Sequence, residues 1–266
     1  MLNKDLVLTD NEFKIIRDMM YDYSGVLLKP TKKTMIISRL SKRIRELKLF
    51  SIKEYINLMM KNIREKEIFI NLITTNETYF FREKVHLDFL IDTIKKENRK
   101  TIKIWSAACS TGEEPYSISI YLKQNLPFVR PTILATDINT DVLNQAKKAE
   151  YNSFRLRAVP EEWKKKYFKL IKERDKIKWY KLTTSLIHRV QFKQHNLLTP
   201  IGQTFDFIFL RNVMIYFDNE IKQRVIKNME ASLNKGGYLI IGRSENIFSL
   251  KHNLKHVASS TYKKGE

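Results

Sequence analysis

Residues 104–119 read IWSAACSTGEEPYSIS, and this stretch decides the fold class. Residues 101–105 are rich in β-formers, and the apolar, periodic residues 116–126 follow, which predicts a strand, a tight turn and a helix. Gly112 lets the backbone turn and approach a ligand closely, and Pro115 suits the first turn of a helix, where its missing N–H is not needed. Because open α/β sheets bind ligands at the carboxyl ends of their strands, this turn is a candidate ligand site.

A second apolar strand, residues 133–137, ends in Asp137. An acid at this place can accept hydrogen bonds from both hydroxyls of a ribose. The chain has neither GxGxxG nor GxxxxGK[ST], and Glu113 and Glu114 would repel a pyrophosphate. A positively charged nucleoside without phosphate, such as S-adenosylmethionine, fits better. A glycine turn and an Asp-ended strand also occur for structural reasons alone, so that alternative stays open at this point.

The 266 residues carry 49 Lys and Arg against 29 Asp and Glu, a formal net charge of +20. Residues 76–150 hold 11 basic and 10 acidic side chains, whereas residues 151–195 hold 13 and 4. Nucleic acid is the usual partner of so basic a protein, but an acidic protein surface attracts it equally well. We expect a soluble, cytoplasmic globular protein, because 43% of the residues are hydrophobic and no signal peptide or apolar run of about 18 residues occurs.

The single cysteine, Cys109, excludes an internal disulfide and a Cys-rich metal site. No base is evident beside it, so we expect a small packing residue rather than a catalytic thiol. His195 could serve as a general base, but a surface or hydrogen-bonded histidine is more common. No metal is expected.

Five blocks of the sequence resemble the CheR family, the bacterial chemoreceptor glutamate methyltransferases. The signature is WSAACSTGEEPYS at residues 105–117, and the others are TTNETYFFRE (74–83), ATDI (135–138), RNVMIYF (211–217) and SEN (244–246). The resemblance runs from about residue 10 to the C-terminus. It implies an α/β fold, in which residues 76–266 form a Rossmann-like S-adenosylmethionine methyltransferase sheet. Residues 1–75 would form an N-terminal all-helical domain, and residues 151–194 or so a small inserted antiparallel β-subdomain.

The resemblance also implies the site residues. Those expected to bind the cofactor are Asn76, Thr78, Arg82, Glu113, Asp137, Asn196, Leu197, Leu210, Arg211 and Asn212. Arg82 and Tyr216 are expected to be catalytic. Arg82 would orient the acceptor carboxylate through a charge-assisted bond, and Tyr216 would position it through its hydroxyl or shelter the sulfonium with its ring. A glutamate acceptor is ionised at neutral pH and needs no general base. We expect Phe80 and Phe81, and Ile215 and Phe217 on either side of Tyr216, to be core residues.

The predicted helix of residues 31–47 carries Arg39, Lys42 and Arg43 at i, i+3 and i+4. Such a face is usually just solvated. The family's N-terminal helices, however, carry basic residues thought to meet the acidic receptor helix, so we expect these three to bind substrate.

In the insertion, the sequence predicts a helix at residues 161–171 and an antiparallel pair of strands at residues 176–182 and 185–192. Some family members grip a receptor-tail pentapeptide here through a glycine-containing turn. No glycine lies between Gly112 and Gly202, so we expect no such tether.

The function that the resemblance implies is methyl transfer from S-adenosylmethionine to glutamates of chemoreceptors, leaving S-adenosylhomocysteine, in the adaptation of bacterial chemotaxis. The partner would be the cytoplasmic helical domain of methyl-accepting chemoreceptors. We expect the protein to act as a monomer that is recruited to membrane-bound receptor arrays. No nucleic-acid partner and no membrane insertion are expected. Two alternatives are a nucleic-acid methyltransferase, which the charge favours, and a non-catalytic S-adenosylmethionine-sensing module. The first lacks an Asn/Asp-Pro-Pro-Tyr/Phe motif, and a module without activity has no need for the catalytic residues.

Overall fold

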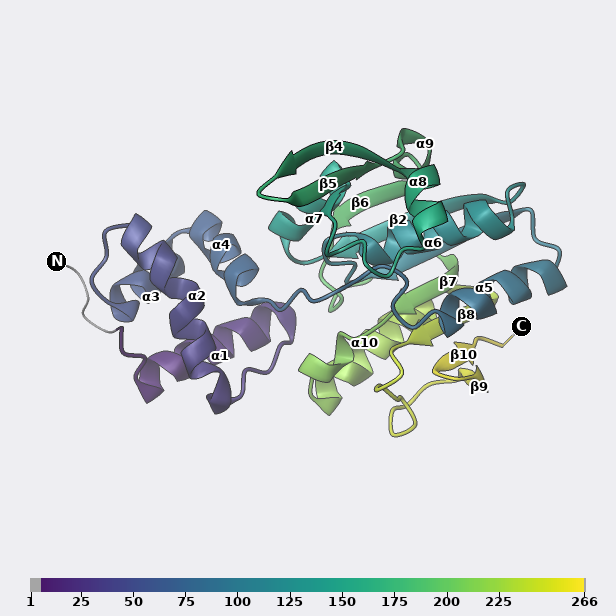
Figure 1. Cartoon of the computed structure of the whole chain (residues 1–266). Coiled ribbons are helices and arrows are strands. Elements are labelled where there is room, and N and C mark those ends of the chain that lie inside the picture. Colours follow the sequence, from purple (N-terminus) through teal and green to yellow (C-terminus); the bar gives the residue numbers. More distant parts are fainter. Residues whose placement is uncertain (1–5, 266) are drawn as a thin grey trace. The chain divides into compact units, whose positions relative to one another are not determined.

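A computed structural model of the chain describes residues 6–265. Its contacts divide it into two compact units (Figure 1). The first, called here the helical unit, holds the residues up to Thr75 together with Tyr216–Asp218. The second, the α/β unit, holds Asn76–Ile215 and the residues from Asn219 onward. No helix within residues 6–265 combines the length and the apolar character needed to cross a membrane.

The helical unit is built from short helices whose ends are capped locally: α1 (Asp10–Ser24), η1 (Pro30–Lys32), α2 (Lys33–Glu46), α3 (Ile52–Lys61) and α4 (Ile63–Ile73). Thr9 and Glu12 form a capping box at the start of α1, and Gly25 ends it at a φ of 74°. Ser51 and Asn62 cap α3 and α4. The apolar faces meet in one core, which includes Ile16, Met20, Ile36, Leu40, Tyr55 and Phe69.

The α/β unit is a seven-stranded sheet in the order β6-β2-β1-β7-β8-β10-β9. The strands are β1 (Thr101–Ala107), β2 (Arg130–Asp137), β6 (Val190–Gln194), β7 (Phe205–Leu210), β8 (Leu233–Ile241), β9 (Lys255–Ala258) and β10 (Thr261–Lys263). The first five named are parallel, and β10 runs antiparallel to β8 and to β9. The chain leaves β1 toward β2 and β6 on one side and later returns to β7 and β8 on the other. The order therefore reverses between β1 and β7, where this class of sheet binds ligands.

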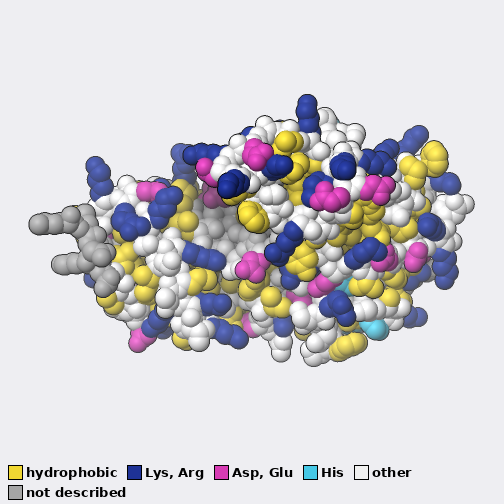
Figure 2. All heavy atoms as spheres, viewed as in Figure 1, with side chains coloured by type: hydrophobic (Ala, Val, Ile, Leu, Met, Phe, Trp, Pro, Cys, Tyr) yellow, Lys and Arg dark blue, Asp and Glu magenta, His cyan; other side chains and the backbone are white. Residues whose placement is uncertain are grey.

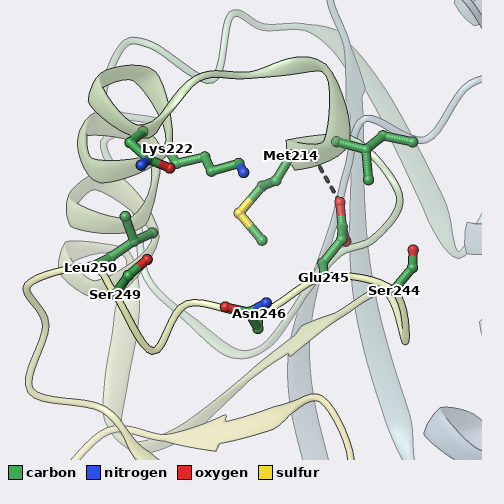
Figure 3. Close-up of a pocket in the computed structure, with 9 residues that line it drawn as sticks. Met214, Lys222, Ser244, Glu245, Asn246, Ser249 and Leu250 are labelled. Atoms are coloured by element: carbon green, nitrogen blue, oxygen red, sulfur yellow. Dashed lines mark hydrogen bonds between the residues drawn. The ribbon is translucent and has the colours of Figure 1, made fainter.

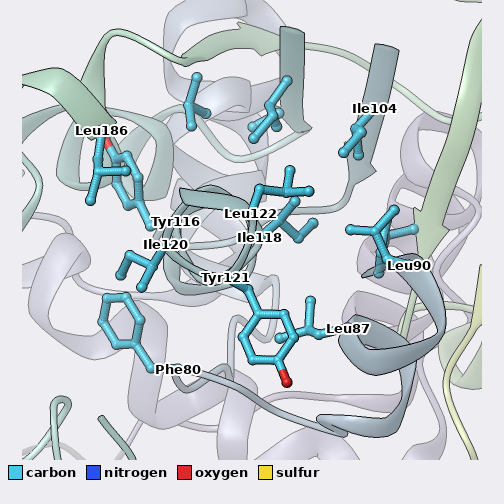
Figure 4. Packing of buried hydrophobic residues seen from close by; sticks show 14 of the residues in the cluster. Phe80, Leu87, Leu90, Ile104, Tyr116, Ile118, Ile120, Tyr121, Leu122 and Leu186 are labelled. Carbon is cyan, nitrogen blue, oxygen red and sulfur yellow. The ribbon is translucent and has the colours of Figure 1, made fainter. Parts of the chain in front are cut away.

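Helices α5 (Val85–Lys96), α6 (Glu113–Asn125), α7 (Thr140–Lys148) and α10 (Asn219–Ala231) cover the sheet (Figure 1). Helix α6 is buried on nearly all sides over residues 115–122, Ser117 and Ser119 included, and lies in the middle of the core (Figure 4). Phe80 is fully buried there, and Phe81 packs against the same cluster, as expected. This packing holds the start of α6, and with it the signature turn, against the sheet.

A second, three-stranded antiparallel sheet is inserted between α7 and β6, in the order β3-β5-β4. It is formed by β3 (Glu150–Asn152), β4 (Phe168–Arg174) and β5 (Ile177–Leu182). The inserted antiparallel subdomain is thus confirmed, but its predicted elements were partly wrong. Helix α8 (Glu161–Tyr167) ends before residue 171, because residues 168–174 pair with β5.

The strand predicted at residues 185–192 was correct only for residues 190–192, and its predicted partner was wrong. Residues 184–187 form the short helix α9 (Thr184–Ile187), and Val190–Gln194 is the edge strand β6 of the large sheet, paired with β2. A β-rich run does not specify which sheet it will join, because its partner strand is remote in sequence.

The exposed surface reflects the composition. On the face drawn in Figure 2, Lys and Arg side chains are spread widely, and Asp and Glu side chains are fewer. The excess positive charge is therefore displayed to solvent and available to an acidic partner.

Candidate active site

The signature turn between β1 and α6 is held in an unusual backbone conformation. Ala108, Ser110 and Gly112 have positive φ values of 61°, 50° and 91°. A Cβ on Gly112 would lie 2.9 Å from the Cβ of Ala146 and 3.0 Å from the hydroxyl of Tyr151, so glycine is needed for packing as well as for the turn. Left-handed non-glycine residues are costly and tend to gather at functional sites.

Asp137 lies where β2 ends, as the sequence predicted, and is 7% exposed. Its Oδ2 accepts a hydrogen bond from the Ser110 N–H at 2.8 Å, and its Oδ1 accepts one from the Asn139 N–H at 2.9 Å. Burial raises the pKa of Asp137 above its ordinary value, although these backbone N–H groups act in the opposite direction. Within residues 6–265 the carboxylate has no cationic partner, which leaves oxygen lone pairs for hydroxyl donors.

Glu113 is completely buried at the first position of α6 and is paired within the protein. The Thr111 hydroxyl donates to its Oε2 at 2.6 Å, and Arg155 forms an ion pair with its Oε1. Arg155 also donates to the Thr111 hydroxyl at 2.9 Å. The sequence analysis missed Arg155, because no motif links it to a glutamate 42 residues earlier.

Arg211 is the centre of a buried polar cluster, called here the Arg211 cluster, with Glu114, Glu83 and His86. Its side chain is 4% exposed; Nε donates to Glu114 Oε2 at 2.7 Å, and Nη1 lies 3.9 Å from Glu83 Oε2. Nη1 also donates to the Arg82 carbonyl at 2.8 Å and lies 3.2 Å from His86 Nδ1. Burial and the nearby Arg211 lower the pKa of His86 to about 4, so His86 is neutral.

The Arg211 cluster also fixes the backbone position of Arg82, because Arg211 donates a hydrogen bond to the Arg82 carbonyl oxygen. Its neighbours Phe81 and Glu83 have positive φ values of 57° and 51°, so the backbone bends sharply on both sides of it. The Arg82 guanidinium lies over the Tyr79 ring at 5.6 Å and donates to the Glu77 carbonyl at 3.3 Å. Both contacts are weak, and the group can turn toward a carboxylate.

Of the other expected cofactor residues, Leu210 and Asn212 lie at the end of β7, whereas Asn76 and Thr78 lie on the segment before α5. Leu210 ends β7 and is fully buried, so a ligand could meet only its backbone. Asn212 has a φ of 57° and donates its N–H to Glu245 Oε2 at 2.8 Å. The Asn76 carbonyl accepts from the Ser110 hydroxyl at 2.8 Å, and Thr78 is half-buried on the same segment.

Asn196 and Leu197 follow β6. The Asn196 side-chain oxygen accepts from the Leu198 N–H at 3.0 Å, and Leu197 is buried. The backbone N–H of His195, just before them, donates to the Asp137 carbonyl at 3.0 Å, and the imidazole meets the Trp105 ring edge-on. Burial and Lys193 lower the pKa of His195, so it is a neutral structural residue at neutral pH.

Cys109 is confirmed as a buried packing residue. Burial and the carboxylates of Asp137 and Glu114 raise the pKa of its thiol well above the ordinary value. It is therefore protonated, and within residues 6–265 no group of three or more His, Cys, Asp and Glu is placed to hold a metal ion.

Tyr216 ends the 3₁₀ helix η2 (Met214–Tyr216), and its carbonyl accepts from the Leu27 N–H at 2.9 Å within the helical unit. Phe217 is buried as expected, but Ile215 is 54% exposed, so its assignment to the core was wrong. Both residues that flank Tyr216 were expected in the core, and the tight 3₁₀ turn instead directs Ile215 to solvent.

The three basic residues of α2 differ in what they contact. Arg39 Nη1 donates to the carbonyls of Ile73 and Thr74 at 2.7 and 3.0 Å, at the end of α4. Arg43 pairs with the buried Glu65 at 2.6 Å. Lys42 is 82% exposed, and its only ion pair among the described residues is a loose one, 3.8 Å from Glu46.

The contacts of Asp137, Glu113 and Arg211 surround the edge of the sheet that is formed by the carboxyl ends of β1, β2 and β7. Glu113 and Glu114 are compensated by Arg155 and Arg211, so among the described residues of this edge Asp137 is the carboxylate without a cationic partner. A buried carboxylate with free oxygen lone pairs, beside a turn without a phosphate-binding loop, is compatible with the nucleoside part of S-adenosylmethionine. The fold and this edge define the class: a Rossmann-like S-adenosylmethionine-dependent methyltransferase.

Comparison with known proteins then identifies the family. Residues 76–263 match the family domain described as CheR methyltransferase, SAM binding domain, and residues 11–74 match CheR methyltransferase, all-alpha domain. This chain belongs to the CheR methyltransferase family.

Relatives are similar along nearly the whole chain. A chemotaxis protein methyltransferase 2 of Pseudomonas aeruginosa is 37% identical over 98% of this chain and 95% of its own length. The chemotaxis protein methyltransferases of Borreliella burgdorferi and Escherichia coli are 37% and 33% identical, each over 98% of this chain, and over 97% and 93% of their own lengths. Both units are therefore shared with these enzymes.

Proposed function

We propose that this protein methylates glutamate side chains of chemoreceptors, using S-adenosylmethionine and forming glutamyl methyl esters. The observation that carries the proposal is the similarity, over both units, to relatives named chemotaxis protein methyltransferases. The acidic cytoplasmic helices of such receptors would suit a chain with a net charge of +20. We place the activity in the cytoplasm, at receptor arrays, with the protein acting as a monomer.

The titratable groups near the strand ends favour an acceptor that arrives already ionised. His86 and His195 are neutral and held in structural contacts, and the Cys109 thiol is buried and protonated. A glutamate carboxylate has an ordinary pKa of about 4.3, so it needs no base at neutral pH. An amine or hydroxyl acceptor would need a proton removed, and these groups are poorly suited to that task.

The cofactor, when bound, supplies a methyl group activated on a sulfonium. Asp137 would accept hydrogen bonds from its ribose hydroxyls, since the carboxylate has no cationic partner among the described residues. The remaining residues proposed to contact it are Asn76, Thr78, Arg82, Glu113, Asn196, Leu197, Leu210, Arg211 and Asn212. Of these, Glu113 and Arg211 are paired inside the protein, so we assign them mainly to holding the signature turn and the Arg82 backbone.

Arg82 and Tyr216 are the proposed catalytic residues. The Arg82 guanidinium has only weak contacts and could pair with the acceptor carboxylate as water is excluded. Tyr216 would position the same carboxylate through its hydroxyl or face the sulfonium with its ring.

Lys42 is the strongest candidate for contact with the receptor, because it is exposed and only loosely paired. Arg39 and Arg43 already hold α4 and Glu65, so a receptor contact would be additional to their structural work. We further propose that binding does not use a pentapeptide tether.

The decisive experiment incubates the protein with methyl-labelled S-adenosylmethionine and membranes that contain the native receptors. We expect label on receptor that mild base releases as methanol, since carboxyl methyl esters hydrolyse readily. Base-stable label, or label on RNA, would refute the glutamate assignment and favour the nucleic-acid alternative that the net charge suggests. Binding of the cofactor without any transfer would favour a sensing module.

Variants test the assigned residues in the same assay. Arg82→Ala should abolish transfer, whereas Arg130→Ala, an exposed arginine at the opposite end of β2, should not. Turnover of Arg82→Ala at the wild-type rate would remove Arg82 from the mechanism. Asp137→Asn should weaken cofactor binding in calorimetry, with exposed Asp141→Asn as the control, and unchanged affinity would refute the ribose contact.

A further inference from the structure

His86 is a buried polar residue that has no assigned role in the site described above. It lies in the first turn of α5 and is 1% exposed. Its Nε2 lies near the Ser259 backbone without a hydrogen bond of ordinary geometry, and it has no other partner within residues 6–265. Because an unpaired buried polar atom lowers stability, an apolar side chain would suit this place better unless the other ring nitrogen is needed.

The other ring nitrogen, Nδ1, lies against Arg211. Nη1 of Arg211 carries two N–H groups, and it lies 2.8 Å from the Arg82 carbonyl oxygen and 3.2 Å from His86 Nδ1. Arginine cannot accept a hydrogen bond, so the second contact is a hydrogen bond only when Nδ1 has a free lone pair and Nε2 carries the proton.

Two observations bear on that tautomer. Burial and the charge of Arg211 lower the pKa of His86 to about 4, which keeps the ring neutral. Glu83 Oε2 lies 3.4 Å from the same Nδ1, farther than Arg211 Nη1 does. A proton on Nδ1 would therefore serve the more distant neighbour and would set two N–H groups against each other at the nearer one.

The backbone next to Arg211 is fixed by a different residue. Glu245 accepts hydrogen bonds from the N–H groups of Asn212 and Met214, both at 2.8 Å, and the bond to Met214 is the dashed line in Figure 3. On the Arg211 side chain, Nε donates to Glu114 Oε2 at 2.7 Å. These contacts fix the backbone beside the arginine and one edge of its guanidinium. The direction of Nη1 is left to its own two acceptors.

Arg82 depends on the direction of Nη1, because the backbone on both sides of it is in a costly conformation. Phe81 and Glu83 have positive φ values of 57° and 51°. Residues other than glycine keep such values only where surrounding contacts impose them. Arg211 Nη1 holds the carbonyl of the residue between these two. If Nη1 turned away, this segment would be free to relax, and the Arg82 guanidinium would move with it.

We propose that His86 is a positioning residue for methyl transfer, a role that rests on the proposed function, in which Arg82 is catalytic. The lone pair of its Nδ1 directs Arg211 Nη1 toward the Arg82 carbonyl, and this holds Arg82 in place for the acceptor carboxylate. His86 touches neither the cofactor nor the acceptor, and it transfers no proton. Its contribution is a fixed acceptor, present in one tautomer of the neutral ring.

Two polar substitutions separate this role from packing. The side-chain oxygen of Asn can take the place of Nδ1, whereas Gln carries its polar end to the place of Nε2. We expect His86→Gln to lower kcat for receptor methylation roughly tenfold and to change the affinity for S-adenosylhomocysteine less than about twofold, because one acceptor is lost and Asp137 is untouched. His86→Asn should keep kcat within about threefold of wild type.

The matched control is His188→Gln, which changes an exposed histidine and should behave as wild type. Equal kcat values in His86→Gln and His86→Asn would overturn the proposal, since the position of the acceptor would then not matter. The proposed function is tested separately by Arg82→Ala. Loss of transfer in that variant together with an unaffected His86→Gln removes the role of His86 alone, whereas wild-type turnover of Arg82→Ala removes the catalytic assignment and the role of His86 with it.

A second measurement uses the wild-type protein and needs neither turnover nor a folded variant. Long-range ¹H–¹⁵N correlation spectra at pH 7 report which ring nitrogen carries the proton in each of the five histidines of the chain. We expect His86 to carry its proton on Nε2 and to have none on Nδ1. A proton on Nδ1 would mean that the ring donates to Glu83 and does not accept from Arg211, and it would overturn the proposal whatever the kinetics show.

Discussion

Arg155 forms an ion pair with Glu113, although the two residues are 42 positions apart. One follows a strand of the inserted sheet and the other follows a strand of the large sheet. Glu113 opens α6 in the signature turn, and Arg155 follows β3 of the inserted sheet. Tyr151, on β3 itself, donates its hydroxyl to the Thr111 carbonyl at 2.7 Å. The insertion therefore holds the turn that the cofactor site depends on, whatever else it contacts.

This pair predicts a positioning role for Arg155. Its removal leaves a buried carboxylate without a cation, although partial exposure of the arginine softens the loss, so we expect Arg155→Ala to bind cofactor about tenfold more weakly. Arg155→Lys should restore part of the affinity, because lysine keeps the charge and loses the fork geometry. Calorimetry with S-adenosylhomocysteine measures both. The control is Arg157→Ala, an exposed arginine two residues on, and an equal loss in that variant would contradict the assignment.

We expect the helical unit to lose stability at acidic pH because of the ion pair that Glu65 forms. Hydrogen bonds from Arg43 lower its pKa, with Tyr55 acting in the same direction. Since the folded-state pKa lies below the unfolded one, the pair's stabilisation is fully present above about pH 4.5 and is lost as the pH falls through the folded value. We expect Glu65→Gln to lower the free energy of unfolding at pH 7 by about 1–3 kcal/mol and to flatten its decline toward pH 4.

Denaturant unfolding at pH 7 and pH 4, followed through the helical signal, measures this effect. Glu67→Gln changes an exposed glutamate on the same helix and should keep the wild-type pH dependence. A Glu65→Gln protein with wild-type stability at pH 7 would show that the ion pair contributes nothing net, as happens for some buried pairs.

A substitution in the tight turn between β4 and β5 of the inserted sheet should stabilise the folded protein. Asp175 and Lys176 connect β4 to β5 with φ values of 50° and 61°, the left-handed pair of a type I′ turn, which usually holds glycine at the second place. We expect Lys176→Gly to raise the free energy of unfolding by about 0.5–1 kcal/mol, because relief of the left-handed strain exceeds the added chain entropy. Lys178→Gly, inside β5, should have the opposite sign in the same thermal unfolding measurement.

Neutral histidines predict a flat pH profile for methyl transfer. The pKa of His195 is lowered from its ordinary value of 6.5, and that of His86 to about 4, so neither gains a proton between about pH 6.5 and 8. A glutamate acceptor is also fully ionised there. The rate at saturating cofactor should vary less than about twofold over this window, and His195→Ala should keep kcat. A rise in rate centred near pH 6.5 that His195→Ala abolishes, but exposed His188→Ala does not, would identify His195 as a base.

Local sequence patterns were sufficient wherever the determining interactions are local. The strand ending at Asp137, the turn at Gly112 and the buried Phe80 could be predicted, because alternation, glycine and apolar runs act within a few residues. The same patterns failed at residues 168–174. That segment has helical spacing and continues from α8, yet its backbone hydrogen bonds go to β5 instead. Pairing with a remote partner outweighed the local preference.

For the same reason, the partners of charged side chains could not be predicted from the sequence. Arg39, Lys42 and Arg43 share one predicted helix face, but Arg39 holds carbonyls at the end of α4 and Arg43 holds Glu65, while Lys42 remains exposed. Their spacing placed them together and could not distinguish them, because each partner comes from another helix.

The sequence by itself determined the class of this protein: a parallel sheet with an acid after its second strand, a signature turn without a phosphate loop, and the CheR family motifs. Only the tertiary structure decided which of those motif residues are free to act. Glu113 is bound by Arg155, Arg211 by Glu114, and Glu245 by backbone N–H groups, whereas Asp137 has no charged partner among the described residues. The reason is physical: a side chain's availability depends on neighbours that folding brings from 30 to 100 residues away, and no local pattern contains them.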